Sequence, residues 1–244
     1  MKRPSAIATA LDRPETKQDA VDEVFDAVAQ RYDLGNDLMS LGWHTRWKRR
    51  LLDGLDLPPG TQVLDLATGT GDLAWDIAER LEDGLVVASD INKAMLAVAR
   101  RKQRPTRSPV TFEVADAMAL PYDDASFDLV VCGYAGRGFP SWPVVAAEVH
   151  RVLRPGGVFW NLDFARPHPP WWDGVVRAWM TASGGLLGLV LHGHAATYTY
   201  IPQTLARYPG QRWLTTELER VGFRVVMTET TGALMAYHKA EKAS

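Results

Sequence analysis

Apolar positions change their spacing along the chain, and each change indicates a different kind of element. From Val21 to Ala29 apolar residues recur every three or four positions, which is typical of one face of a helix. A second helical pattern runs from Trp43 to Leu55 and ends before Pro58-Pro59-Gly60, a combination that breaks helices. Residues 1–17 have no sustained apolar period, so we expect them to form a disordered tail.

Beyond residue 60, short apolar runs alternate with helical patterns. Such alternation predicts a mostly parallel sheet with right-handed crossovers and helices on both faces, and the last two runs predict a closing antiparallel pair. Arg154-Pro155-Gly156-Gly157 reads as a turn. The predicted strands are Gln62–Leu66, Leu85–Ser89, Val110–Val114, Phe127–Cys132, Val158–Asp163, Phe223–Glu229 and Ala233–His238, and the predicted helices among them are Asp72–Leu81, Lys93–Arg101, Pro143–Leu153 and Leu214–Val221.

The 244 residues are enough for one α/β domain with elaborations. We expect that domain to span 18–244, with N-terminal helices at 18–58 and an insertion on the substrate side at 167–210. The formal charge of −2 gives no reason to expect nucleic acid as a partner. The single cysteine, Cys132, lies in an apolar strand pattern and reads as a buried thiol in a reducing cytoplasm.

The stretch from Ala178 to Ala206 contains no charged residue. Its purely apolar core, Leu186 to Leu191, is much shorter than the roughly 20 residues that a membrane span requires. We therefore expect a buried or interfacial segment and no transmembrane helix. No signal peptide is recognisable at the N-terminus.

The segment from Val63 to Asp72, Val-Leu-Asp-Leu-Ala-Thr-Gly-Thr-Gly-Asp, joins a buried strand to a helix through a glycine-rich turn. Gly69 and Gly71 permit a sharp bend and the close approach of a ligand. The flanking carboxylates of Asp65 and Asp72 would repel a pyrophosphate, whereas they suit a ligand with an amino group and a sulfonium. This difference favours S-adenosylmethionine over a dinucleotide.

Two more aspartates follow later strands. Asp90 ends the second predicted strand, where a carboxylate can accept hydrogen bonds from both hydroxyls of a ribose. Asp116 follows the third strand, where an adenine amino group would lie. Each aspartate alone reads as a helix cap or turn residue. Acids at the ends of three successive strands indicate a binding site instead, because open α/β sheets bind ligands at that edge.

The sequence also resembles the UbiE/MenG quinone C-methyltransferases, from about Val24 to Tyr237. The most specific match is the N-terminal signature, which begins at Phe25 and contains Arg31-Tyr32-Asp33, Asn36-Asp37 and His44-x-x-Trp47-Lys48. Further matching segments are Leu129–Arg137, Arg151–Gly157, Asp163–Pro167 and the tyrosine-rich Tyr198–Pro209.

This resemblance implies a Rossmann-like, seven-stranded class I methyltransferase fold and an enzyme that uses S-adenosylmethionine. It further implies methyl transfer to a ring carbon of a prenylated quinol such as demethylmenaquinol. No metal ion is expected. Tyr32 would help to close the site, and the implied cofactor contacts are Thr70, Asp90, Asp116, Ala117 and the backbone of Gly133.

Two departures from the family pattern concern the acceptor. Ala135-Gly136-Arg137-Gly138 stands where the family usually has Gly-Leu-Arg-Asn, so the arginine is kept and its polar neighbour is lost. Gly193-His194-Ala195-Ala196 replaces a segment rich in Asn and Asp. A relative with a shifted substrate, such as a phenol, an amine or a phospholipid headgroup, is one alternative. A catalytically silent subunit is another.

A quinol carbon becomes nucleophilic when the adjacent hydroxyl loses its proton. Arg137 is our candidate for stabilising the phenolate. The base is either His194, whose ordinary pKa is near neutrality, or a water held by Tyr32 and Arg137. Tyr198 and Tyr200 either pack on the ring or belong to the core.

Val175, Val176, Trp179 and Met180 fall on one helical face within the insertion. They form either core or a groove for an isoprenoid tail, with Trp179 in contact with the substrate. The groove would place the enzyme peripherally on a membrane from the cytoplasmic side. A homodimer is a further expectation.

Overall fold

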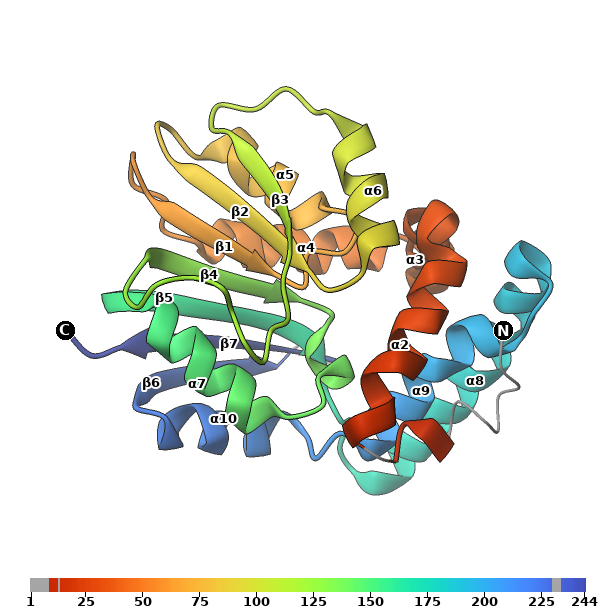
Figure 1. Cartoon of the computed structure of the whole chain (residues 1–244). Coiled ribbons are helices and arrows are strands. Elements are labelled where there is room, and N and C mark those ends of the chain that lie inside the picture. The colour runs from red at the N-terminus through yellow and green to blue at the C-terminus, as the bar shows by residue number, and fades with distance from the viewer. Residues whose placement is uncertain (1–8, 13, 230–233) are drawn as a thin grey trace.

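The computed structural model describes residues 9–12, 14–229 and 234–244, and a seven-stranded sheet forms its centre (Figure 1). The strand order is β3-β2-β1-β4-β5-β7-β6. The five neighbours β3, β2, β1, β4 and β5 pair in parallel, whereas β7 runs antiparallel to both β5 and β6. The predicted fold class is therefore confirmed. The strands are β1 (Gln62–Leu66), β2 (Leu85–Asp90), β3 (Val110–Val114), β4 (Phe127–Gly133), β5 (Leu153–Phe164), β6 (Phe223–Glu229) and β7 (Met235–Lys242).

Helices cover both faces of this sheet, which explains why its central strands are continuous apolar runs. On one face, α7 (Trp142–Val152) and α10 (Gln211–Arg220) bury Val145, Val149, Leu214 and Leu218. The other face is covered by α4 (Trp43–Gly54) and α5 (Asp72–Arg80), and α6 (Lys93–Lys102) packs against β3. The resulting layers place the carboxyl ends of the parallel strands along one edge.

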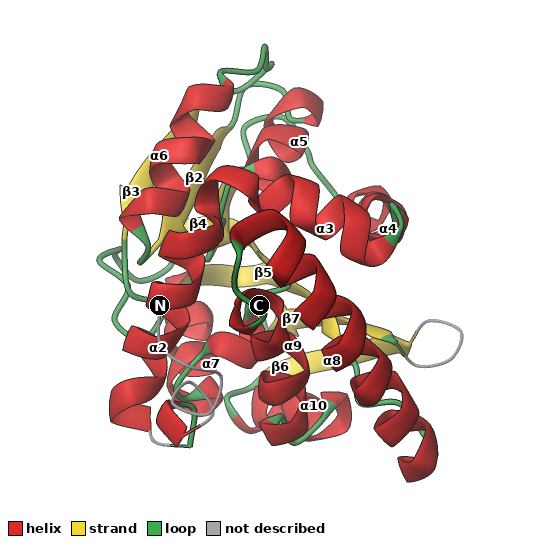
Figure 2. Ribbon diagram, turned by 90° about the vertical axis from the view of Figure 1, so that its right-hand side faces the viewer, coloured by secondary structure: helices red, strands yellow, loops and turns green. Residues whose placement is uncertain are grey.

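A group of helices stands at that edge and comes from two distant parts of the chain (Figures 1 and 2). The N-terminal part consists of α2 (Pro14–Val28), the short η1 (Ala29–Arg31) and α3 (Tyr32–Ser40). The insertion contributes a hairpin of α8 (Pro170–His192) and α9 (Ala196–Arg207). Helix α3 contacts α8, and α2 contacts α6 and α9. Helices α2, α3, α8 and α9 therefore cover the edge of the sheet at the carboxyl ends of its parallel strands.

The expected disordered tail is wrong for part of its length. Helix α2 already begins at Pro14, and Leu11 is buried against Val21, Val24 and Ile201. This contact orders the chain because it removes an isolated apolar side chain from water. Residues 1–8 and 13 lie outside the described residues.

Two further boundaries differ from the sequence patterns. Strand β5 already begins at Leu153, so the expected turn at 154–157 lies within it. Gly156 has φ +78°, and the pairing of β4 with β5 shifts register between Phe127 and Leu129. A local irregularity thus replaces the turn. Strand β7 begins at Met235, and the predicted start at Ala233 lies outside the described residues.

Helix α8 is longer than its sequence pattern indicated. Among the described residues it is the one helix that is long and apolar enough to cross a membrane by length and composition alone. Its most apolar 18-residue window has a mean hydropathy of 1.4, and 22% of that window is buried. A single helix of this kind also occurs in soluble proteins. The buried residues Val176, Met180, Gly184 and Gly188 show that one side of it packs on the protein.

We predict opposite effects for two glycine substitutions within α8. In Gly188→Ala the added Cβ would lie 2.6 Å from the carbonyl oxygen of His194, so we expect a loss of about 1–3 kcal/mol in the free energy of unfolding. In the control Gly174→Ala the Cβ meets nothing within 4 Å, and the better helix propensity should stabilise by about 0.5–1 kcal/mol. Urea unfolding measures both. Equal effects would contradict the close packing of α8 on the turn before α9.

Candidate functional site

The glycine-rich turn after β1 is held in place by the carboxylate of Asp90 at the end of β2. One oxygen of Asp90 accepts from the amide of Gly69 at 2.8 Å, and the other accepts from the amide of Asn92 at 2.8 Å. Gly69 has φ +58°, a conformation that favours glycine. Burial raises the pKa of the Asp90 carboxyl to about 6. The turn and the second strand end thus form one rigid corner.

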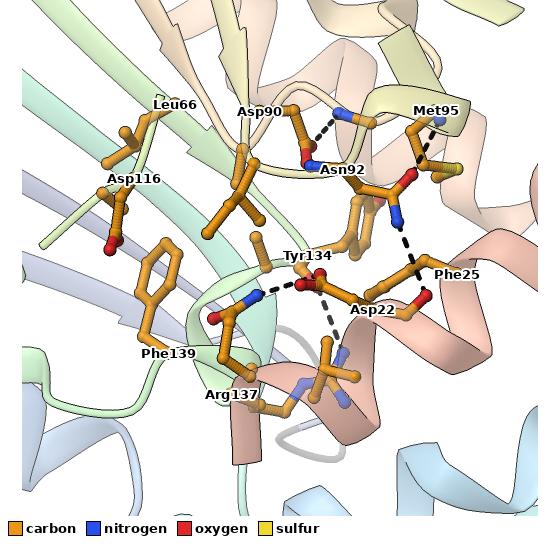
Figure 3. A pocket seen from close by; sticks show the side chains of 18 of the residues that line it. Asp22, Phe25, Leu66, Asp90, Asn92, Met95, Asp116, Tyr134, Arg137 and Phe139 are labelled. Carbon is orange, nitrogen blue, oxygen red and sulfur yellow. Dashed lines mark hydrogen bonds between the residues drawn. The ribbon is translucent and has the colours of Figure 1, made fainter. Parts of the chain in front are cut away.

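This corner is part of a pocket that we call the cofactor pocket (Figure 3). Five of the nine residues predicted to bind the cofactor line it, namely Gly69, Asp90, Asp116, Ala117 and Gly133. Sequence reasoning missed further side chains that line it: Gln18, Asp22 and Phe25 from α2, Asn92 from the loop after β2, Met95 from α6 and Phe139 from the segment after β4. Phe25 opens the N-terminal signature described above, so a signal for it existed.

Helix α2 makes the cofactor pocket narrow, with a volume of about 80 Å³. Binding pockets for small molecules usually have roughly 300 Å³ or more. Two contacts hold the helix in this position. The side-chain amide of Asn92 donates from Nδ2 to the carboxylate of Asp26 at 2.8 Å, and Lys17 Nζ donates to the backbone carbonyl of Phe139 at 2.6 Å. Helix α2 thus lies against the cofactor pocket and narrows it.

The other four predicted cofactor residues support the pocket without lining it. Asp65 is 1% exposed and accepts a hydrogen bond from the Thr68 hydroxyl, and burial raises the pKa of its carboxyl to about 7. Gly71 begins α5 with φ +79°, and a Cβ there would lie 2.9 Å from Ala99. Its glycine therefore serves the packing of α5 on α6, and Gly71 does not line the cofactor pocket.

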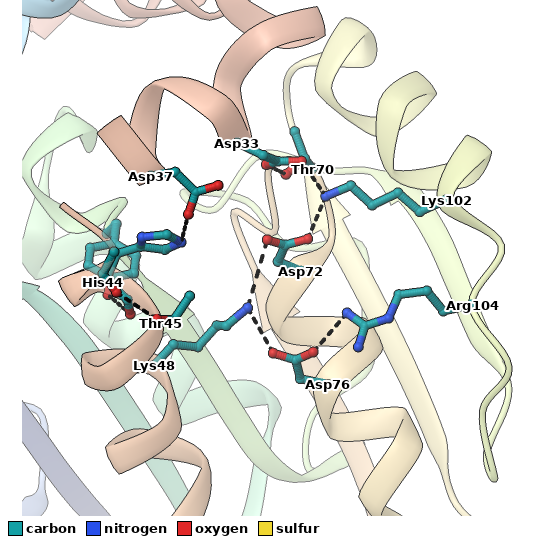
Figure 4. A network of polar contacts seen from close by, with 12 residues as sticks. Asp33, Asp37, His44, Thr45, Lys48, Thr70, Asp72, Asp76, Lys102 and Arg104 are labelled. Atoms are coloured by element: carbon teal, nitrogen blue, oxygen red, sulfur yellow. Dashed lines mark hydrogen bonds and ion pairs between the residues drawn. The ribbon is translucent and has the colours of Figure 1, made fainter. Parts of the chain in front are cut away.

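Thr70 and Asp72 belong to a network of polar contacts on the outer side of the turn (Figure 4). The Thr70 hydroxyl donates to Asp33 of α3 at 2.6 Å. Lys102 Nζ lies 2.7 Å from Asp33 and 2.5 Å from Asp72, and Lys48 Nζ lies 2.8 Å from Asp76. These contacts attach α3 and α4 to α5 and α6. Asp72 pairs with both lysines and does not line the cofactor pocket, so its contact with a cationic ligand stays a prediction.

The chemistry of the cofactor pocket fits S-adenosylmethionine. Three carboxylates, Asp22, Asp90 and Asp116, face it and offer acceptors to an amino group and to ribose hydroxyls. The one cationic side chain among its described lining residues is Arg137, which is paired with a carboxylate of its own. Gly69 and Gly133 leave the backbone accessible. The pocket therefore suits a cationic nucleoside and disfavours a pyrophosphate.

A second and much larger cavity, of about 1100 Å³, adjoins the first, and we call it the acceptor pocket. Its walls come from α3, α4, α8, α9 and β7. They are mainly apolar and aromatic: Met39, Trp43, Trp47, Phe164, Trp172, Val175, Val176, Trp179, Met180, Tyr198, Tyr200, Ile201, Leu234 and Tyr237. The predicted substrate residues Tyr198, Tyr200 and Trp179 are all among them. This composition suits a long apolar molecule.

Tyr32, Tyr134, Arg137 and Tyr200 line both pockets and so mark the place where the two meet. Burial raises the pKa values of Tyr32 and Tyr200, so both phenols stay protonated at neutral pH and can donate hydrogen bonds. Tyr134 is fixed by a bond of 3.1 Å from its hydroxyl to the carbonyl of His44. The predicted catalytic residues Tyr32 and Arg137 thus lie together.

Arg137 is buried, and its guanidinium donates its hydrogen bonds to groups of the protein. Its Nε donates to Asp163 at 2.6 Å, Nη1 donates to Thr204 at 3.1 Å and Nη2 donates to the carbonyl of Tyr134 at 3.3 Å. The guanidinium also lies 4.7 Å above the centroid of the Phe164 ring. These contacts hold its planar group at the junction of the pockets in one orientation.

The structure does not bring His194 to this junction. Its side chain is exposed, just beyond α8, and it lines neither pocket. The histidine in the acceptor pocket is His44, which sequence reasoning cited only as part of a motif. Its Nδ1 lies 2.9 Å from the Ser40 hydroxyl, and burial lowers the pKa of its imidazole, so the ring is neutral at pH 7. His194 as the base therefore stays a prediction that this geometry does not support, because its side chain lines neither pocket.

Comparison with known proteins identifies the family. The profile of the ubiE/COQ5 methyltransferase family matches residues 13–242. The chain belongs to this family. It is 38% identical over 221 residues to a demethylmenaquinone methyltransferase of Deinococcus radiodurans, covering 88% of this chain and 92% of that protein. The ubiquinone/menaquinone biosynthesis C-methyltransferase UbiE of Rhizobium leguminosarum bv. trifolii is 35% identical, with 93% and 90% covered.

Solved structures agree on the fold. A SAM-dependent methyltransferase from Aquifex aeolicus superposes with a TM-score of 0.59 at 18% identity, covering 80% of this chain and 88% of that one. One from Mesorhizobium loti gives 0.57 at 18% identity, covering 80% and 96%. Membership of the ubiE/COQ5 family makes this chain an S-adenosylmethionine-dependent methyltransferase, as its cofactor pocket indicates.

We predict that cofactor affinity falls below about pH 6. Because the pKa of the Asp90 carboxyl is about 6 in the free protein, this carboxyl is protonated at lower pH. A cationic ligand binds the ionised carboxylate, so binding at low pH requires that Asp90 first lose its proton, and the affinity falls. Calorimetric titration with S-adenosylhomocysteine and S-adenosylmethionine between pH 5 and 8 measures this. Asp90→Asn should weaken binding at pH 8 about tenfold or more and flatten the profile. An unchanged profile in the variant would contradict the role of Asp90.

Proposed function

We propose that this enzyme methylates a ring carbon of a prenylated quinol, with a demethylmenaquinol as the type of acceptor. The observation that carries the proposal is the apolar acceptor pocket of about 1100 Å³, which meets the cofactor pocket at four shared residues. A soluble phenol or amine would leave most of this apolar space unfilled. The printed names of the relatives from Deinococcus and Rhizobium support the same class of acceptor.

In the proposed reaction the ring of the quinol lies at the junction and its tail extends between α4 and α8. When bound, S-adenosylmethionine supplies the electrophilic methyl group. Tyr32 and Tyr200 can donate hydrogen bonds to the ring oxygens, and Tyr134 and Phe164 form an aromatic wall at 6.4 Å between centroids. Alignment of the attacking carbon with the methyl group is the main contribution expected from the protein.

The acceptor hydroxyl must lose a proton, and the guanidinium of Arg137 stabilises the resulting phenolate only in part. Its ion pair with Asp163 already neutralises most of its charge, and its role is to orient the donors around the junction. We propose that the proton leaves either through a water held by Tyr32 and Arg137 or to the neutral imidazole of His44. Both routes begin in the acceptor pocket.

We further propose that the enzyme works on the cytoplasmic membrane surface. Large apolar side chains stand exposed beside the acceptor pocket on α3, α4 and α8: Leu34, Leu38, Leu41, Trp43, Trp171, Val175, Trp179, Leu186, Leu189 and Val190. Figure 2 shows α3, α4 and α8 on one side of the molecule. Arg46, Arg49 and Arg50 accompany them on α4. Tryptophan and arginine beside aliphatic residues are typical of surfaces that insert into anionic lipid. The homodimer remains a prediction.

The first test is a turnover assay with reduced demethylmenaquinols of different tail length, followed by mass spectrometry. We expect a product heavier by one methyl on the ring carbon. Trp179→Ala should raise KM for a prenylated quinol roughly tenfold and leave the tail-less quinol unaffected, because Trp179 lines the acceptor pocket. Trp171→Ala is the control, since this tryptophan of the same helix lies outside the pocket lining. Cofactor binding without any quinol product would refute the proposed acceptor.

Membrane contact is tested by flotation with vesicles of phosphatidylglycerol. Leu186 and Val190 are 65% and 72% exposed on one side of α8. Their double replacement by serine should weaken vesicle binding about tenfold. Val226→Ser on β6, where the side chain is 59% exposed, is the control and should change nothing. Equal binding of all three proteins would argue against this surface as the membrane contact.

A further inference from the structure

Arg137 also borders a third cavity, which lies behind the junction and has a volume of about 290 Å³. Its walls come from the residues around η2 (Gly136–Gly138), the start of α7, the end of α9 and the beginning of α10. The established chemistry of the methyltransferase does not use this space. It can hold a small polar molecule of a few heavy atoms.

The charged side chains that line this cavity are all cationic. Lys17, Arg137 and Arg207 line it, and none of its described lining residues is an aspartate or glutamate. Arg137 is paired with Asp163 and Arg207 with Asp12, whereas Lys17 makes no ion pair within the described part of the chain. Burial, Arg137 and Arg207, in this order, lower the pKa of the Lys17 ammonium to about 8. Lys17 is therefore the one lining cation of this cavity whose charge no carboxylate of the described residues offsets.

Two further features offer hydrogen-bond donors to the same space. Trp142 is 5% exposed, and its indole Nε1 is buried without a hydrogen-bond partner. A buried donor without an acceptor is costly, so an acceptor from a ligand would relieve it. The cavity also lies at the N-terminal end of the 11-residue helix α7, where Ser141 makes no side-chain capping bond. The positive end of the α7 dipole and the amide of Trp142 favour an anion there, whereas Pro143 contributes no N–H.

We propose that this cavity binds an anion of the phosphate class, either free phosphate or the phosphate group of a small metabolite. Lys17 and Arg207 would supply the charge, and Trp142 Nε1 and the start of α7 would supply neutral donors. The carboxylates of the cofactor pocket make that pocket unsuitable for the same ligand, so the two sites differ in what they accept. Since Arg137 forms a wall of all three cavities, the anion would lie directly behind the junction.

The test is calorimetric titration of the full chain with inorganic phosphate and with glycerol phosphate, at ionic strength held constant with sodium chloride. We expect saturable binding of one anion per chain. Tighter binding of glycerol phosphate would indicate that the natural ligand is a phosphorylated metabolite. Tighter binding of inorganic phosphate would indicate that it is the free ion. Absence of saturable binding of either would overturn the proposal.

Two variants locate the site. Lys17→Met should weaken phosphate binding at least tenfold, because it removes the cation without an ion-pair partner. Trp142→Phe keeps an aromatic ring against Phe139 and Phe159 but removes the Nε1 donor, so we expect a several-fold loss. Lys93→Met, at an exposed lysine that begins α6, is the control and should bind phosphate as the unaltered chain does. Undiminished phosphate binding in Lys17→Met would overturn the assignment, and circular dichroism checks that each variant is folded.

Discussion

A buried ion pair between Arg137 and Asp163 connects the parts of this enzyme that must stay in register. Asp163 of β5 accepts from both the amide and Nε of Arg137, and the guanidinium donates onward to Thr204 of α9. Loss of one partner would leave an uncompensated charge in the interior, a change that typically costs about 3–5 kcal/mol. The sheet edge, the loop after β4 and the inserted hairpin are therefore held together at one point.

Charge is divided around that point in a way that matches the chemistry of each cavity. The cofactor pocket presents carboxylates, the acceptor pocket is largely apolar and the third cavity presents cations. Arg137 can border all three because Asp163 neutralises it on one side. A cationic nucleoside and a phosphate-class anion can then occupy neighbouring spaces without competing for the same groups.

The N-terminal helices matter because they close the sheet edge from outside the central fold. Asp33 of α3 bonds Thr70 of the glycine-rich turn, and Lys102 joins the same carboxylate to α6. Helix α2 reaches the cofactor pocket with Asp22 and Phe25. The N-terminal helices thus complete the cofactor pocket, whereas α8 contributes to the acceptor pocket.

The strand pattern and the glycine-rich turn were readable from the sequence because both depend on local chemistry. A strand covered on both faces is a continuous apolar run, and glycine is the residue that most readily adopts the left-handed backbone of Gly69. The position of Asp90 at the strand edge was readable for the same reason, since it directly ends β2. Only the tertiary structure decided which polar groups meet. It paired Asp72 with lysines and left His194 in solvent, because such contacts depend on helices far apart in the sequence.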